Sequence, residues 1–194
     1  MAVVAHPLGE NSINQYLLLR IQPDGLHVSY RLDFAENLTA IEMRTLDADH
    51  DGNVSDAEQK AYLADHADEW ASRITVRISG KERKIKVVSV DLKLTPTGNG
   101  RSTLLILLDV VAATDPLPSG ATSISVVTGN YDHIPGWREC AALAADRFWI
   151  QDGNKQVKSK LLDQRGETAE KGDDWTVAFI CLAPAPSTRP ITVP

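Results

Sequence analysis

The sequence predicts a mainly β protein, an antiparallel β-sandwich of immunoglobulin-like type with a helix-loop-helix inserted into it. Apolar and polar residues alternate along several segments bounded by turn residues, a pattern typical of half-buried strands. Between residues 37 and 74 the apolar spacing becomes that of a helix. A chain of 194 residues with 43% hydrophobic residues can bury one core. We therefore expect a single domain over 1–194 that carries a helical insertion at 37–74.

The strands are justified by their alternation and by the turns between them. The first follows the turn Pro23-Asp24-Gly25 and places Leu26, Val28, Tyr30 and Leu32 on one face. A hairpin is predicted over 74–94 with its turn at Ser79-Gly80-Lys81. The Asp152-Gly153 pair predicts a second hairpin. Further strands are expected over 102–113, 122–131, 148–162 and 174–184, and the Pro-rich tail 184–194 is expected to be an extended linker.

The insertion reads as two helices joined by an acidic loop. Apolar residues at helical spacing precede and follow the loop, so each helix has a face to pack on the sheet. The residues expected on these faces are Leu38, Ile41 and Thr45 before the loop and Leu63, Ala67, Trp70, Ala71 and Ile74 after it.

The loop itself has the ligand spacing of an EF-hand. Aspartates occupy positions 1, 3 and 5, Gly52 occupies position 6 where the backbone needs a positive φ, and a glutamate closes the set at position 12. Alternate positions of such a loop point inward together and supply the oxygen ligands that Ca²⁺ prefers. Val54, at position 8, is expected to face the core. The predicted ligands are Asp47, Asp49, Asp51, Asn53, Ser55 and Glu58.

Calcium is favoured over the alternative of a metal-free acidic turn, because converging carboxylates repel one another without a cation. The chain shows one such loop and has only two methionines, whereas sensor EF-hands work in pairs and expose a Met-rich groove. We therefore expect calcium to brace the structure, with the low affinity of extracellular modules.

Three segments carry a resemblance to a known family. "AHPLGENSINQY" (residues 5–16), "VSYRLDFAE" (28–36) and "GNYDHIPGWRE" (129–139), taken with the acidic loop, resemble the amino-terminal extracytoplasmic domain of bacterial nickel/cobalt permease and exporter-type membrane proteins. The resemblance covers Ala5 to about Glu139 and implies a sandwich domain in the periplasm or at the cell surface. It also implies membrane-embedded helices later in the full-length protein as a partner.

Two other functions remain open besides a non-enzymatic calcium-binding domain. A metal-sampling domain for Ni²⁺ or Co²⁺ would use His6, with His133 and His27 as further ligands. A hydrolase with an unrecognised site is the third, although no GxSxG, HExxH, GxGxxG or phosphate-loop motif is present.

Charge and cysteine content bear on partners and on the cell compartment. A net charge of -6 without a basic stripe argues against nucleic-acid binding. Cys140 and Cys181 lie far apart in the sequence, and both a disulfide between them and two separate buried thiols are consistent with it.

Overall fold

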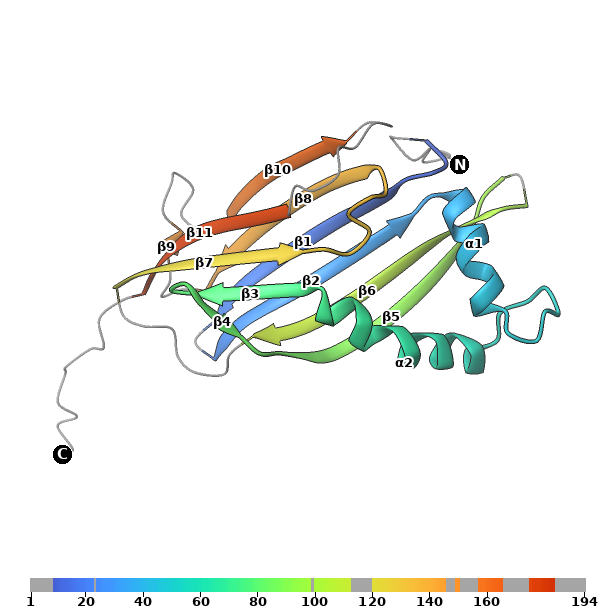
Figure 1. Cartoon of the computed structure of the whole chain (residues 1–194), viewed down its shortest axis with the longest axis horizontal. Coiled ribbons are helices and arrows are strands. Elements are labelled where there is room, and N and C mark those ends of the chain that lie inside the picture. Colours follow the sequence, from blue (N-terminus) through green and yellow to red (C-terminus); the bar gives the residue numbers. More distant parts are fainter. Residues whose placement is uncertain are drawn as a thin grey trace, which may run out of the picture.

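The computed structural model describes residues 9–22, 24–98, 100–112 and 121–145 in full. For residue 120 and for 149–150, 157–165 and 175–183 it describes the backbone alone. These residues form a mainly β protein with two helices and two sheets (Figure 1).

The large sheet has six strands in the order β10-β8-β1-β2-β6-β5. Most neighbours pair antiparallel, but β1 and β8 pair parallel, so the prediction of a purely antiparallel sheet was wrong. The strands are β1 (Ile13–Gln22), β2 (Gly25–Phe34), β5 (Ile85–Pro96), β6 (Ser102–Ala112), β8 (Gly136–Ala144) and β10 (Val157–Arg165).

The small sheet has five strands in the order β4-β3-β7-β11-β9. The predicted turn at Ser79 and Gly80 joins β3 to β4, and both residues have positive φ. The chain then crosses to the large sheet, because β5 pairs with β6. The strands are β3 (Ile74–Ile78), β4 (Lys81–Arg83), β7 (Gly120–Thr128), β9 (Trp149–Ile150) and β11 (Trp175–Ala183).

The hairpin expected around Asp152-Gly153 is absent from this pairing. β9 pairs with β11 in the small sheet, whereas β10 pairs with β8 in the large sheet. The two strands that flank the Asp-Gly pair therefore belong to different layers. Residues 151–156 and the tail 184–194 lie outside the described residues.

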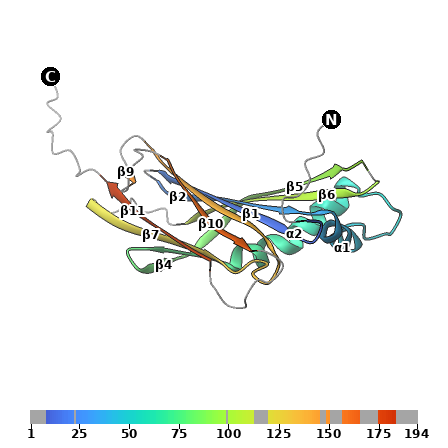
Figure 2. The same cartoon turned by 90° about the horizontal axis from the view of Figure 1, so that it is seen from above.

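The helices α1 (Glu36–Leu46) and α2 (Asp56–Ser72) lie beside the small sheet, on the same side of the large sheet (Figure 2). α1 contacts β6, and α2 contacts β5, β6 and β3. The large sheet is thus covered by the small sheet over one part and by the helices over another. The insertion is an integral part of the second layer.

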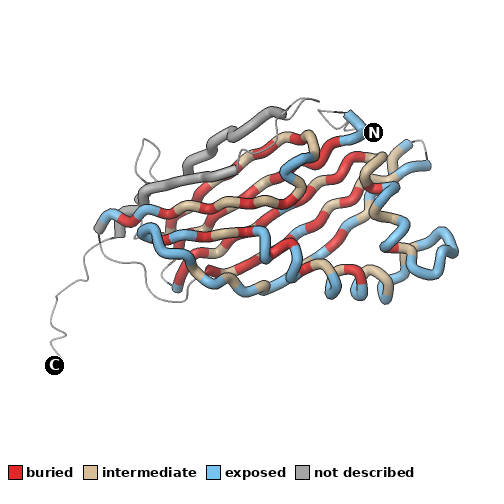
Figure 3. Tube along the Cα trace, viewed as in Figure 1, coloured by how far each residue is buried: buried red, intermediate tan, exposed pale blue. Residues whose placement is uncertain are grey.

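The core lies between these layers, as the alternating burial along the strands shows (Figure 3). On β2 the predicted face is confirmed, with Leu26, Val28, Tyr30 and Leu32 each at most 1% exposed. β1 alternates in the same way and is a central strand that the sequence reading missed. On α1 the predicted face was partly wrong: Ile41 is 56% exposed, and Leu46 is buried instead.

The outer strands of both sheets are either irregular or short. β5 and β10, at the edges of the large sheet, each contain a register shift, between Val87 and Ser89 and between Leu161 and Asp163. β4 and β9, at the edges of the small sheet, have three and two residues. The edges therefore offer short or irregular ladders.

A buried polar network joins the two sheets and α2. The Tyr30 hydroxyl on β2 donates to Gln15 Oε1 on β1 at 2.6 Å, and Gln15 Nε2 donates to the carbonyl oxygen of Asn130 at 3.0 Å. The Asn130 amide donates to Thr128 Oγ1 at 3.2 Å and to the carbonyl oxygen of Trp70 at 2.9 Å. Because each of these polar groups is buried and paired, the loop that follows β7 is held in one position.

Asn130→Ala should destabilise the protein by about 2–4 kcal/mol, because two buried hydrogen bonds are lost and the Trp70 carbonyl loses its donor. Urea unfolding followed by tryptophan fluorescence measures the change. Asn11→Ala removes an exposed asparagine and should cost less than about 1 kcal/mol. Equal losses for both variants would contradict a central role for Asn130.

Close backbone contact explains the glycine that begins β8. A Cβ on Gly136 would collide with the carbonyl carbon and oxygen of Ile13 on β1, in backbone that has little room to move. The Ile13 amide also donates to the Pro135 carbonyl oxygen at 2.9 Å, so β1 and the start of β8 are tightly joined.

Gly136→Ala should therefore cost about 3 kcal/mol or more, because the β1–β8 contact must open. Gly98→Ala is the matched control, since an added Cβ there meets no atom within 4 Å. A urea midpoint that shifts equally little for both variants would show that this contact tolerates a side chain.

Candidate functional site

The acidic loop, residues 47–58, joins α1 to α2 and is anchored at both ends. α1 ends at Leu46, which is 1% exposed, and the Asp47 amide donates to the Met43 carbonyl oxygen at 2.9 Å. α2 begins after Ser55, whose side chain forms a reciprocal capping box with Glu58. Val54 packs against the core, as its loop position predicted. The loop is thus fixed on the apolar side while its polar side stays accessible.

The aspartates fold the loop by accepting hydrogen bonds from amides further along it. Asp47 accepts from the Asp51 amide at 3.2 Å and from the Gly52 amide at 3.0 Å. Asp49 accepts from the Asp51 amide at 3.1 Å, and Asp51 accepts from the Asn53 amide at 2.7 Å. Gly52 has the predicted positive φ, 86°. These hydrogen bonds therefore wind the backbone tightly around the aspartate side chains.

Glu58 reaches back across the loop from the first turn of α2. Its Oε1 accepts from the Ala48 and Asp49 amides at 2.8 and 3.3 Å, and its Oε2 accepts from the Ser55 amide and hydroxyl at 2.8 and 2.7 Å. The backbone bond from Ser55, followed by its hydroxyl bond, lowers the pKa of Glu58 to about 2. The carboxylate is thus ionised and held toward the start of the loop.

Three of the six predicted ligands converge. Asp47, Asp49 and Glu58 each place a carboxylate oxygen within 4.8 Å of the other two. Asp51 lies outside this group, and its Oδ1 accepts from the Asn53 amide. Ser55 directs its hydroxyl to Glu58. An all-oxygen cluster of three carboxylates can hold a metal ion, and it fits a hard cation better than a soft one.

A second contact joins the helices on either side of the loop. The Tyr62 hydroxyl on α2 donates to Glu42 Oε2 on α1 at 2.7 Å. Burial raises the pKa of Tyr62 above its usual range, with a further contribution from this hydrogen bond. The loop therefore spans two helices that are also joined through side chains.

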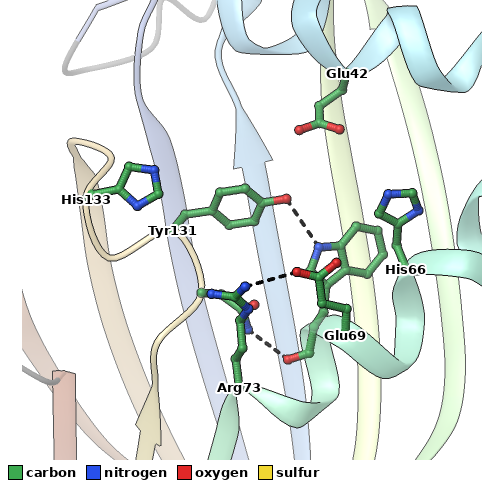
Figure 4. Close-up of a pocket in the computed structure, with 8 residues that line it drawn as sticks. Glu42, His66, Glu69, Arg73, Tyr131 and His133 are labelled. Carbon is green, nitrogen blue, oxygen red and sulfur yellow. Dashed lines mark hydrogen bonds and ion pairs between the residues drawn. The ribbon is translucent and has the colours of Figure 1, made fainter.

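The histidines of the alternative metal site are not brought together. His27 lies near the start of β2, against Asp24 at 3.3 Å. His133 lies in the β7–β8 loop (Figure 4), beside Asp132. That loop is joined to the start of β1, because the Ile13 amide donates to the Pro135 carbonyl oxygen, and Ile13 pairs with Phe34, the last residue of β2. Seven strand residues, about 23 Å, separate His27 from Phe34. His27 and His133 therefore do not share an ion, and His6 lies outside the described residues.

The structure answers two other sequence predictions, on the cysteines and on membrane-spanning helices, only in part. Cys140 is a buried free thiol on β8 whose burial raises its pKa to about 12, and the side chain of Cys181 lies outside the described residues. In the part of the chain that the structure describes, neither helix is long and apolar enough to cross a membrane.

Models of known protein families match no part of the chain, and a search of curated proteins finds no match.

Metal-free protein should lose the contribution of Glu58 to stability as the pH falls. Its folded pKa of about 2 lies below the ordinary value of 4.5, so this contribution is present above about pH 4.5 and disappears as the pH falls toward 2. Urea unfolding of chelator-treated protein between pH 2 and 6 should show a shallower pH dependence for Glu58→Gln than for wild type. Parallel profiles would contradict the depressed pKa.

Proposed function

We propose that this protein is a non-enzymatic calcium-binding domain in which Ca²⁺ acts as a structural brace. The observation that carries the proposal is the convergence of Asp47, Asp49 and Glu58 in a loop with full EF-hand spacing. Asp51, the Asn53 carbonyl and Ser55 complete the proposed ligand set. Binding would relieve the repulsion among the carboxylates and tie the end of α1 to the start of α2.

The setting of the loop favours a brace over a switch. α2 packs on β5, β6 and β3, and its carbonyl at Trp70 belongs to the buried network that joins the sheets. A helix fixed at that end cannot swing open as sensor helices do without breaking core contacts. Calcium would therefore stabilise the arrangement of α1 and α2 and the surface that they form, which we propose to be an interaction surface.

An extracytoplasmic location follows from this proposal together with the resemblance to permease-associated domains. A solitary, exposed loop is expected to bind calcium with the affinity of extracellular modules, about 10⁻⁴ to 10⁻³ M. Such a site fills where calcium is abundant. We accordingly propose a periplasmic or cell-surface domain that is tethered to a membrane-embedded segment of the full-length protein.

Calorimetry on chelator-treated protein tests the brace. Addition of 5 mM CaCl₂ should raise Tm by about 3–8 °C, because calcium at about 5 to 50 times its Kd stabilises a protein by about 1–2 kcal/mol. The same concentration of MgCl₂ should raise it less, since Mg²⁺ demands a rigid octahedral site.

Two variants separate the effect of calcium binding in the loop on Tm from a general effect of charge. Glu58→Gln should abolish the calcium-dependent rise in Tm, whereas Asp65→Asn, which removes an exposed charge elsewhere on α2, should retain it. An unchanged wild-type Tm with calcium, or an equal response in both variants, would rule out the brace.

A further inference from the structure

A cavity of about 250 Å³ lies between the two helices and the loop after β7. Glu42 enters it from α1, His66 and Glu69 from α2, and Tyr131 and His133 from the β7–β8 loop (Figure 4). The cavity contains none of the predicted calcium ligands. Its residues come from three separate parts of the chain, so no local motif indicates it.

Buried aromatic rings hold the wall that α2 contributes. Tyr62, His66 and Trp70 follow one another at a spacing of four residues and therefore share one face of the helix. His66 stacks on Tyr62 with ring centroids 4.3 Å apart and lies 5.6 Å from Trp70. Because Tyr62 and Trp70 are 4% and 3% exposed, the His66 ring rests on a fixed support.

The hydrogen bonding of His66 fixes which nitrogen can act as an acceptor. Its Nδ1 lies 2.8 Å from the carbonyl oxygen of Tyr62, and a carbonyl oxygen only accepts hydrogen bonds. Nδ1 therefore carries the proton, and Nε2 of the neutral ring offers a lone pair. No described residue donates a hydrogen bond to this Nε2.

Tyr131 contributes a second acceptor. Its hydroxyl oxygen accepts from Trp70 Nε1 at 3.2 Å, and its ring packs edge-on against Phe34 with centroids 5.3 Å apart. Burial raises the pKa of Tyr131 to about 12, so the phenol stays neutral at physiological pH. The hydroxyl oxygen points into the same space as the Glu42 carboxylate (Figure 4).

The carboxylates add charge to these acceptors. Glu42 uses Oε2 for the Tyr62 hydroxyl, and Glu69 uses Oε1 for Arg73 at 3.1 Å. In the described part of the chain, no donor is bonded to Glu42 Oε1 or Glu69 Oε2. Arg73 balances one of the two negative charges, so the lining carries one net negative charge when the imidazoles are neutral.

Two residues of the lining already use donors within the protein. The Arg73 guanidinium bonds to Glu69, and the Asn130 amide bonds to Trp70 and Thr128 within the buried network. The free acceptor atoms of Glu42, Glu69 and His66, together with the one excess negative charge, complement a ligand that carries a positive charge and several N–H donors.

We infer that this cavity is a binding site for a small organic cation of the alkylammonium type, supplied by a free amine or by a lysine side chain. Glu42 Oε1, Glu69 Oε2 and His66 Nε2 are the acceptors of the lining available to the ammonium N–H groups, and the alkyl part lies against the rings of His66 and Tyr131. The site does not depend on calcium binding, because it uses no residue of the acidic loop.

NMR titrations at a fixed calcium concentration test the inference, with the indole N–H of Trp70 as the reporter. n-Butylammonium should bind saturably with a Kd of about 1–10 mM, as expected for a ligand of five heavy atoms. The neutral isostere 1-butanol should not saturate. Tetramethylammonium, which has charge but no N–H donor, should bind at least about fivefold more weakly. Saturation by 1-butanol, equal binding of tetramethylammonium, or no saturation by n-butylammonium up to 50 mM would overturn the inference.

Variants with opposite expected effects keep the test independent of folding. Glu42→Gln removes the charge but keeps the shape and should weaken n-butylammonium binding about tenfold. Arg73→Gln frees Glu69 from its partner and should strengthen binding about threefold or more. Asp68→Asn removes an exposed charge of α2 outside the cavity and should leave Kd within twofold. Affinities that follow net charge alone, with Asp68→Asn as weak as Glu42→Gln, would overturn the assignment to this cavity.

A comparison of ligands identifies the source of the cation. N-acetyl-lysine amide presents the same alkylammonium group within a peptide unit. Tighter binding than n-butylammonium supports a partner lysine, and weaker binding supports a free amine. Either result is consistent with the cavity only if the binding is also weakened by Glu42→Gln.

Discussion

The fold depends on the buried hydrogen bonds that converge on Asn130. Gln15 on β1, Tyr30 on β2, Thr128 on β7 and the Trp70 carbonyl at the end of α2 are joined within one network. A buried polar group left without a partner is costly, so the network admits one arrangement of these four elements. Sheet packing alone would let the layers slide, because apolar contacts are not directional. The hydrogen bonds fix the register between the layers.

This constraint also positions both candidate sites, which lie along α2. The acidic loop precedes the helix, and the cavity flanks its middle and last turns. The network binds the Trp70 carbonyl in its last turn. Four residues of this region, Gln15, Tyr30, Phe34 and Asn130, come from three segments that lie far apart in the sequence. Their presence in this region therefore has a physical explanation in the packing of the two layers.

Sequence reasoning succeeded where the information is local. The alternation along β2, the turn at Gly80 and the positive φ of Gly52 all depend on neighbouring residues, and the structure confirms each. It failed where distant segments decide the outcome. The parallel pairing of β1 with β8 and the assignment of β9 and β10 to different sheets leave no local pattern. The cavity could not be predicted from the sequence for the same reason, because Glu42, His66 and Tyr131 meet only once the helices have packed.

The edges of the two sheets limit how this domain can associate with other chains. β5 and β10 are interrupted by bulges, exposed lysines such as Lys86 and Lys93 line β5, and β4 and β9 are too short to template a new strand. Copies of this domain at high local concentration would meet edge to edge often. Protected edges keep such encounters from growing into a continuous intermolecular sheet. Recognition of a partner is then left to side chains, whose chemistry discriminates between molecules as backbone pairing does not.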